Sequence, residues 1–186
     1  WLDEKRDTPT TSSGLPLTLP LLQQIQHIDE ITGNRHTQRC RYAKGFYDGK
    51  EREYRGFGWL QITDSTEEMG DDFTPALQTS CWYHTGREED ETQLYGILYQ
   101  DPLAFASAAT RLTTFDSETQ TDLPLENLSD DRRWWLYRAL KGCLLRSETY
   151  GTDAPDVPFS VAQYRYQVRL VQDSTISSPV FFPCHL

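Results

Sequence analysis

Two glutamates in one charged stretch, Glu51 and Glu53, have the types and spacing of a catalytic acid–base pair. They lie in YAKGFYDGKEREYRGFGWLQITD, residues 42–64. Side chains two positions apart share one face of a strand, so the two carboxylates could work together as in a glycosidase. Lys44 and Arg55 would lie within cross-strand reach of Glu53 in the hairpin predicted below. We therefore interpret the two glutamates as neutralised charges of a strand ladder.

Two histidines stand where a base or a metal ligand could stand. His84, in the segment WYHTG, would need an activated serine or cysteine beside it, yet no G-x-S-x-G elbow is present. His27 and Asp29 would share one strand face, but nothing completes a ligand set for a metal. No glycine loop for phosphate is present, since GFG lies inside a predicted strand. We therefore predict no catalytic residue, no cofactor and no metal site.

The cysteines stand too far apart in the sequence to form a C-x-x-C zinc or redox site. Isolated buried thiols are the preferred interpretation. The four residues are Cys40, Cys81, Cys143 and Cys184.

Length and charge narrow the class of protein. The 186 residues suit one domain, and 37% hydrophobic with 25% charged residues is a foldable composition. A net charge of −10 argues against a nucleic-acid partner and against an anionic membrane surface. No apolar run is long enough to span a bilayer, and no signal peptide is evident. From the start at Trp1 we expect a segment of a longer polypeptide.

The centre of the charged stretch predicts a tight hairpin. Asp48 and Gly49 form the pair that favours a two-residue type I′ turn, because both central positions of that turn require positive φ. Opposite-charge and cation–π pairs across the hairpin would each contribute about 0.2–1 kcal/mol. The predicted cross-strand partners are Lys44 with Glu53, Tyr42 with Arg55, and Cys40 with Phe57.

The second strand of this hairpin would have two different faces. One face carries charged and aromatic side chains, and the other has a gap at two glycines that would let another backbone or a ring approach closely. The first face comprises Glu51, Glu53, Arg55, Phe57 and Trp59, and the second comprises Tyr54, Gly56, Gly58, Leu60 and Ile62.

Alternating apolar residues between turn residues predict further strands. Residues 92–100 could form a strand or a short helix, and Pro102 could begin a helical turn. The acidic segments 67–75 and 86–91 are interpreted as solvated loops, and the tail after Asp173 as irregular. The predicted strands are residues 22–30, 77–86, 111–116, 143–151 and 159–172.

One helix is predicted at residues 130–141. Ser129 can cap its start, and Gly142 can supply a left-handed stop. The face that would dock on a sheet comprises Trp135, Leu136, Ala139 and Leu140. The predicted fold is mainly β: an antiparallel, hairpin-rich curved sheet with one substantial α-helix.

Six blocks of the sequence occur in an order typical of one family. They resemble the middle region of the B component of bacterial insecticidal Tc toxin complexes, a region shared with SpvB-type virulence proteins. The resemblance covers nearly the whole chain. The blocks are WLDEK (1–5), DEITGNR (29–35), Y-x-x-G-F-Y-D-G-x-E-R-E-Y-R-G-F-G (42–58), WYHTG (82–86), WWLYRALKGCLLRSETYG (134–151) and YRYQVRLVQ (164–172).

The resemblance implies an architectural role. In the family, this region follows a β-propeller and joins a sheet of Rhs/YD-repeat type. With the C component, that sheet forms a hollow shell around an unfolded cytotoxic polypeptide until the pore of the A component delivers it. Residues 1–186 would then be a single segment of a secreted toxin, with these three partners, no nucleic acid and no direct membrane insertion.

The resemblance also makes the charged stretch a shell-strand motif. The self-cleaving aspartates of the family belong to the C component, so no catalytic residue transfers to this chain. Leu60 and the DST of residues 64–66 depart from the usual family residues, without an evident functional consequence. The motif residues are Tyr42, Lys44, Asp48, Gly49, Glu51, Arg52, Glu53, Arg55, Gly56, Phe57 and Gly58.

Two other classes of function stay open at this point. A binding module could recognise a glycan or a host surface through the aromatic residues Trp59, Trp82 and Tyr83. An enzyme is the third class, and its weakest point is that the candidate glutamates and His84 have no evident partners.

Overall fold

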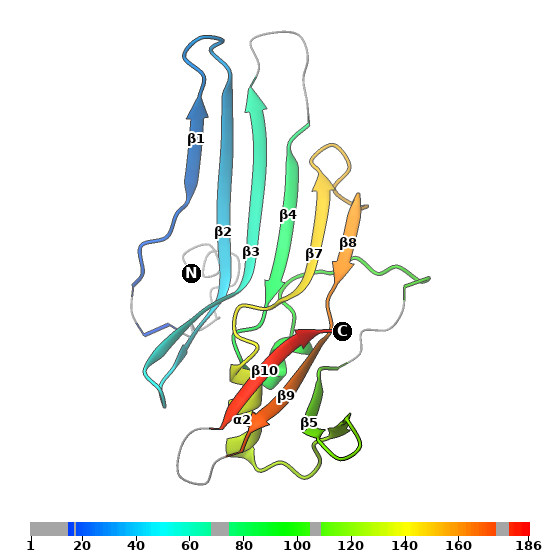
Figure 1. The fold of residues 1–186 in the computed structure, drawn as a ribbon. Helices are drawn as coiled ribbons and strands as arrows, with labels where there is room; N and C mark the ends of the chain where they lie inside the picture. Colours follow the sequence, from blue (N-terminus) through cyan, green and yellow to red (C-terminus); the bar gives the residue numbers. More distant parts are fainter. Residues whose placement is uncertain (1–14, 17, 68–74, 105–108, 174–178) are drawn as a thin grey trace.

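The protein is built from two β-sheets connected by loops and one helix (Figure 1). The computed structural model describes residues 15–16, 18–67, 75–104, 109–173 and 179–186. Within these residues the chain is mainly β, with antiparallel hairpins and one α-helix, as the sequence predicts. No helix in the described ranges is long and apolar enough to cross a membrane.

The larger sheet has six strands, each antiparallel to its neighbours. Its long central pair, β2 and β3, is the hairpin predicted from the charged stretch. Strands β1, β4 and β7 overlap the strands predicted at residues 22–30, 77–86 and 143–151. In order across the sheet, the strands are β1 (Gln24–Ile28), β2 (Arg35–Asp48), β3 (Glu53–Glu67), β4 (Leu77–Tyr83), β7 (Leu144–Gly151) and β8 (Ser160–Gln163).

The smaller sheet has four strands and one parallel pair. Strand β5 runs parallel to β9, whereas β10 and β6 pair antiparallel with β9 and β5. A parallel pair requires a long crossover, and here the crossover includes the helix and two strands of the larger sheet. In order across the sheet, the strands are β10 (Val180–His185), β9 (Tyr166–Gln172), β5 (Arg111–Asp116) and β6 (Thr121–Pro124).

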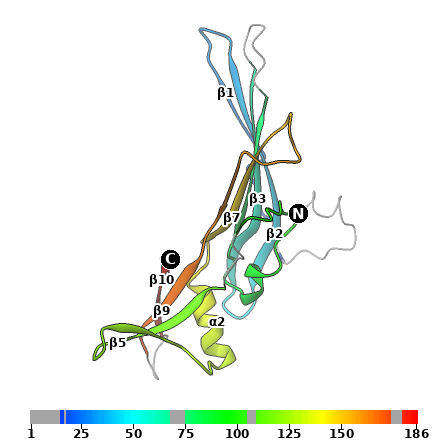
Figure 2. The same ribbon diagram turned by 90° about the vertical axis from the view of Figure 1, so that its right-hand side faces the viewer.

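Helix α2 (Asp130–Arg138) lies beside the smaller sheet (Figure 2). As predicted, the Ser129 side chain caps it by accepting from the Arg132 amide at 3.4 Å. The helix ends at Arg138, before the predicted end at residue 141, and Gly142, with a φ of 83°, lies in the turn that follows. Leu136 and Leu140 are fully buried. They form one core of the molecule with Tyr166 and Val168 of β9 and with Tyr137 of the helix itself.

The second core lies on the larger sheet and is covered by a loop. Trp59 and Trp82 are cross-strand neighbours and are only 8% and 2% exposed. Leu94 and Tyr95 pack against this pair, and the Trp82 indole N–H donates to the Tyr95 carbonyl oxygen at 2.8 Å. The segment 92–100, predicted as a strand or a helix, therefore forms neither and serves as a cover.

Three further predictions about elements were wrong. The strand predicted at residues 159–172 is two strands, β8 and β9, which belong to different sheets. The sequence did not predict this division, because the alternation of side chains is the same in both strands. The tail predicted to be irregular contains β10. Residues 101–104 form a turn and no helix. Residues 105–108, and most of the predicted acidic loop 67–75, lie outside the described residues.

Candidate functional site

The loop at the end of the β2–β3 hairpin is longer than predicted. Asp48 pairs directly with Glu53, so residues 49–52 form the loop and the two-residue type I′ turn is wrong. The buried carboxylate of Asp48 accepts from the Lys50 amide at 2.8 Å and the Glu51 amide at 3.3 Å. An aspartate carboxylate that accepts from the backbone amides of the residues following it stabilises an Asx turn. This turn replaces the expected Asp-Gly turn.

The hairpin register also differs from the prediction. Lys44 does not face Glu53, because the loop of residues 49–52 shifts the pairing along β3. A β-bulge between Phe46 and Tyr47 then leaves Arg55 as an extra residue on β3 and shifts the pairing by one more residue. The glycine after Arg55, Gly56, has a φ of 93°. The observed partners are Tyr42 with Leu60, Cys40 with Ile62, Gly45 with Phe57, and Asp48 with Glu53.

The bulge changes which side chains share a face. Tyr54 and Phe57, predicted on opposite faces, have ring centroids 5.9 Å apart, and Phe57 also contacts Tyr42 at 5.1 Å. A Cβ atom at Gly56 would meet no atom within 4 Å, so this glycine serves backbone conformation. At Gly58 a Cβ would lie 3.2 Å from a Lys44 side-chain carbon, so only this glycine matches the predicted close approach.

Arg55 is the buried centre of the contacts at the loop end of the hairpin. Its side chain is fully buried, and its guanidinium forms an ion pair with the Asp48 carboxylate. One guanidinium N–H donates to the Gly86 carbonyl oxygen at 3.0 Å. The guanidinium also lies 4.9 Å from the centre of a Trp134 ring of α2. Its nearer cation–π partner is therefore on the helix, with the Phe46 ring of β2 farther away at 6.0 Å, and the predicted pairing with Tyr42 is wrong.

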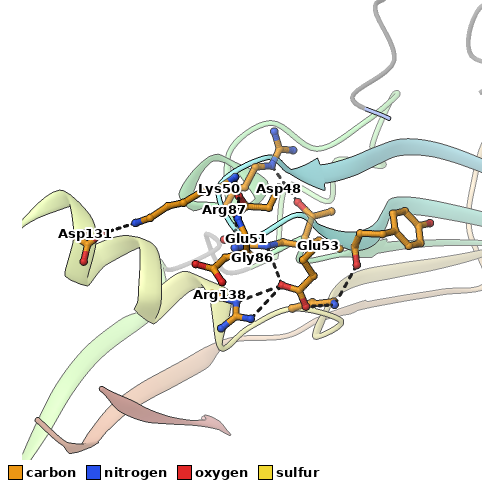
Figure 3. Close-up of polar contacts among 12 residues, drawn as sticks. Asp48, Lys50, Glu51, Glu53, Gly86, Arg87, Asp131 and Arg138 are labelled. Atoms are coloured by element: carbon orange, nitrogen blue, oxygen red, sulfur yellow. Dashed lines mark hydrogen bonds and ion pairs between the residues drawn. The ribbon is translucent and has the colours of Figure 1, made fainter. Parts of the chain in front are cut away.

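Glu53 is held by cations of the helix and of the turn that follows it (Figure 3). Its carboxylate accepts from Arg138 at 3.3 Å and from Lys141 at 2.8 Å. Lys141 and Arg138 hold the pKa of Glu53 below its ordinary value. Glu51 is exposed in the loop. The two glutamates therefore do not form the acid–base pair that their spacing allows.

The hairpin loop reaches the first turn of α2. Lys50 Nζ lies 2.6 Å from Asp131 Oδ1 (Figure 3). It also lies 4.5 Å from the centre of a Trp134 ring. Gly86 packs tightly against the same contacts. Its φ is 86°, and a Cβ there would lie 2.9 Å from Arg55 Nη1 and 3.1 Å from Arg138 Cα. We define the hairpin anchor as Asp48, Glu53, Arg55, Gly86, Trp134 and Arg138.

A second charged cluster surrounds His84, which is 1% exposed. Its Nδ1 lies 3.8 Å from Asp90 Oδ2, and its Nε2 lies 3.4 Å from Glu91 Oε1. Asp90 is 7% exposed and accepts from the amide and hydroxyl of Thr85 at 2.7 and 3.0 Å. The acidic segment 86–91 was predicted as a solvated loop, but it contains a 3₁₀ turn, η1 (Glu88–Glu91), with a buried carboxylate.

A third cluster lies on β7 and was not predicted. Glu148 is 1% exposed and accepts from Arg146 at 2.6 Å, from the Tyr150 hydroxyl at 2.6 Å and from the Tyr99 amide at 3.1 Å. The pKa of Tyr150 is raised by burial and by this carboxylate. Since Tyr99 belongs to the covering loop and Glu148 to β7, the cluster joins this loop to the larger sheet.

The other candidates from the sequence do not form reactive sites. His27 stacks beside His36 with ring centroids 6.3 Å apart, while Asp29 accepts from the Ile31 amide in the turn after β1. Within the described residues, no group of three or more His, Cys, Asp or Glu side chains is placed to hold a metal. The four cysteines are free and half-buried. Of the three aromatic residues of the glycan hypothesis, Trp59 and Trp82 are buried and Tyr83 is half-buried, so the structure does not support that hypothesis.

Two family models match the sequence, and both describe one kind of toxin. The model for the insecticide toxin TcdB middle/N-terminal region matches residues 2–86, and the model for the TcdB middle/C-terminal region matches residues 135–186. No curated protein matches at a significant level.

Solved structures of toxin complexes match over the full length. The structure of TcdB2–TccC3 without the hypervariable C-terminal region is 39% identical, with a TM-score of 0.90. That of TcdB2–TccC3–Cdc42 is 39% identical with a TM-score of 0.91. A Tc holotoxin pore of Photorhabdus luminescens carrying a TccC3 mutation is 39% identical with a TM-score of 0.89. Each comparison covers 100% of this chain and 9% of the matched chain.

Proposed function

Because this chain belongs to the insecticidal TcdB toxin family, as a middle region of the B component, we propose that it is a non-enzymatic structural segment of the toxin shell. It would contribute β-strands to the wall that, together with the C component, encloses a cytotoxic polypeptide. The observation that carries the proposal is the 39% identity over 100% of the chain to TcdB2 in its complex with TccC3.

The charged and polar groups of the chain support this architectural role. The hairpin anchor uses its charges to join β2 and β3 to α2, and the cluster on β7 uses its charges to fix a loop. Neither site leaves a free nucleophile beside a base among the described residues. A side chain held by internal ion pairs stabilises a fixed geometry and is poorly suited to proton transfer.

The position and partners in the assembly follow from the same proposal. The chain would form one segment between a β-propeller and Rhs-like repeats. Its parent would bind the C component as a shell partner and the A component as the delivery pore, since the matched structures include a TcdB2–TccC3 complex and a Tc holotoxin pore. The parent toxin would be secreted. Within it, the residues of the charged stretch form a wall hairpin.

A segment exchange tests the proposal. The corresponding region of TcdB2 is replaced by this chain, and the chimera is produced with TccC3. We expect a B–C complex of normal size in which the enclosed polypeptide resists added protease. As a matched control, the same chimera with Arg55→Met should lose protease protection or fail to assemble. A B–C complex that lacks this segment entirely and still protects the polypeptide would refute a role in the wall.

A further inference from the structure

His84 occupies a buried position at the junction of the two sheets. It follows β4 of the larger sheet, and its backbone exchanges two hydrogen bonds with the turn between α2 and β7. The His84 amide donates to the Cys143 carbonyl oxygen at 2.9 Å, and the Gly142 amide donates to the His84 carbonyl oxygen at 2.9 Å. The His84 ring also lies edge-on to Tyr166 of β9, with centroids 6.3 Å apart.

Glu91 connects the same histidine to the smaller sheet. One carboxylate oxygen accepts from the Thr110 amide at 3.2 Å, and the other accepts from the Thr110 hydroxyl. Thr110 immediately precedes β5. A single carboxylate therefore bridges the imidazole at the end of β4 and the residue that begins the other sheet.

We propose that His84, Asp90 and Glu91 form a charge clamp that holds the two sheets together while His84 is protonated, and that loosens when His84 loses its proton. Neither imidazole nitrogen has a hydrogen-bond partner within the described residues, although both lie within ion-pair distance of a carboxylate. The attraction therefore depends on the positive charge of the ring.

Arg87, Tyr137, Tyr166 and Cys143 also lie near the ring or its two carboxylates. Arg87 Nη2 lies 3.1 Å from Asp90 Oδ1 and partly compensates that carboxylate. Burial raises the pKa of Tyr137 and of Tyr166 to about 12, and it also raises the pKa of the Cys143 thiol. Glu91 has no comparable basic partner apart from His84 among the described residues. It is the carboxylate left uncompensated when the imidazole becomes neutral.

The pKa directions set the pH at which the clamp changes. Burial lowers the pKa of His84, but Asp90 and Glu91 outweigh it and raise the pKa above 6.5. The contribution of His84 to stability is therefore fully present below its unfolded pKa and is lost as the pH rises through its folded pKa. Asp90 and Glu91 have lowered pKa values, so their contribution is lost only in acid.

Hydrogen exchange on the intact parent B component tests the clamp. Protection of peptides that cover residues 84–91 and 109–113 is measured between about pH 6 and about pH 9 and corrected for intrinsic exchange rates. We expect protection to fall by up to about tenfold per pH unit, the limit for one proton, as the pH rises from the unfolded pKa of His84 to its higher folded pKa, and to level off above the folded pKa. Protection that stays constant over this range would overturn the proposal.

Three variants separate the clamp from a general effect of pH. His84→Gln and Glu91→Gln should each abolish the decline, because the first removes the titrating ring and the second removes the uncompensated charge. His36→Gln, at a half-exposed histidine of β2, should retain it. If His84→Gln does not fold, the unmodified protein and Glu91→Gln still decide the question. An unchanged decline in Glu91→Gln would refute the clamp.

Discussion

Arg55 is 2% exposed, and the groups around its guanidinium come from different parts of the chain. Asp48 belongs to the same hairpin, the Gly86 carbonyl follows β4, and Trp134 belongs to α2. A buried charge that loses its partner costs far more than an exposed one, because no water replaces the lost interaction. These residues therefore act as one unit, and replacing any of them leaves a buried charge or polar group of the others without its partner.

Replacing Arg55 by Met should destabilise the protein by about 3–5 kcal/mol, because Asp48 would keep a buried charge without its ion pair. Denaturant unfolding of the variant and the unmodified protein measures this difference. Arg52→Met is the matched control, since Arg52 is exposed in the adjoining loop, and it should change stability by no more than about 0.5 kcal/mol. Equal effects of the two substitutions would contradict the anchor.

Gly86→Ala should destabilise the protein by more than about 1 kcal/mol, because alanine is strained at positive φ and its Cβ would meet Arg55 and Arg138. Thermal unfolding reports the change. Gly49→Ala serves as the control, because a Cβ at Gly49 would meet no atom within 4 Å, and its effect should be small. A neutral Gly86→Ala would show that the backbone there adapts freely.

At the scale of elements, the sequence predicts what local signals determine. The helix start at Ser129 and the buried leucines depend on residues within a few positions of one another, whereas the helix ends at Arg138, short of the stop predicted at Gly142. The hairpin register depends on more than the turn propensity of Asp48 and Gly49. The loop has four residues, and the bulge at Arg55 adds one more residue to β3. The Arg55 side chain contacts Gly86 and Trp134, which no local pattern connects to β3, so turn propensity alone predicted the wrong partners.

The helix cap gives a prediction at this scale. Ser129→Ala should cost about 1 kcal/mol, because the Arg132 amide loses its acceptor at the first turn. The helical signal in circular dichroism and the free energy of unfolding measure the loss. Ser117→Ala, in the exposed turn between β5 and β6, should be nearly neutral. The idea fails if both serines prove equally dispensable.

At the scale of the whole molecule, the sequence predicted the β class and one helix but not the division into two sheets. Within the described residues, the strands at the outer edges of the larger sheet are β1 and β8, and each has a single hydrogen-bonded neighbour. Ile28 and Val161 on these strands are 54% and 39% exposed. Such edges favour pairing with another chain.

The isolated chain should therefore associate as its concentration rises. Light scattering over a concentration series measures the mean mass. Val161→Lys or Ile28→Lys should reduce association, because a charge on an edge strand opposes pairing. Strictly monomeric behaviour of the unmodified chain at high concentration would argue that these edges are already protected.

The parallel pairing of β5 with β9 sets an order of assembly. The two strands meet only after β6, α2, β7 and β8 have been added between them along the chain. Closing so long a loop is slow compared with forming a local hairpin. During synthesis, β2, β3 and β4 can pair early, whereas β5 lacks its parallel neighbour until residue 172 has been made. The smaller sheet should therefore be the last part of this chain to become protected from hydrogen exchange during refolding.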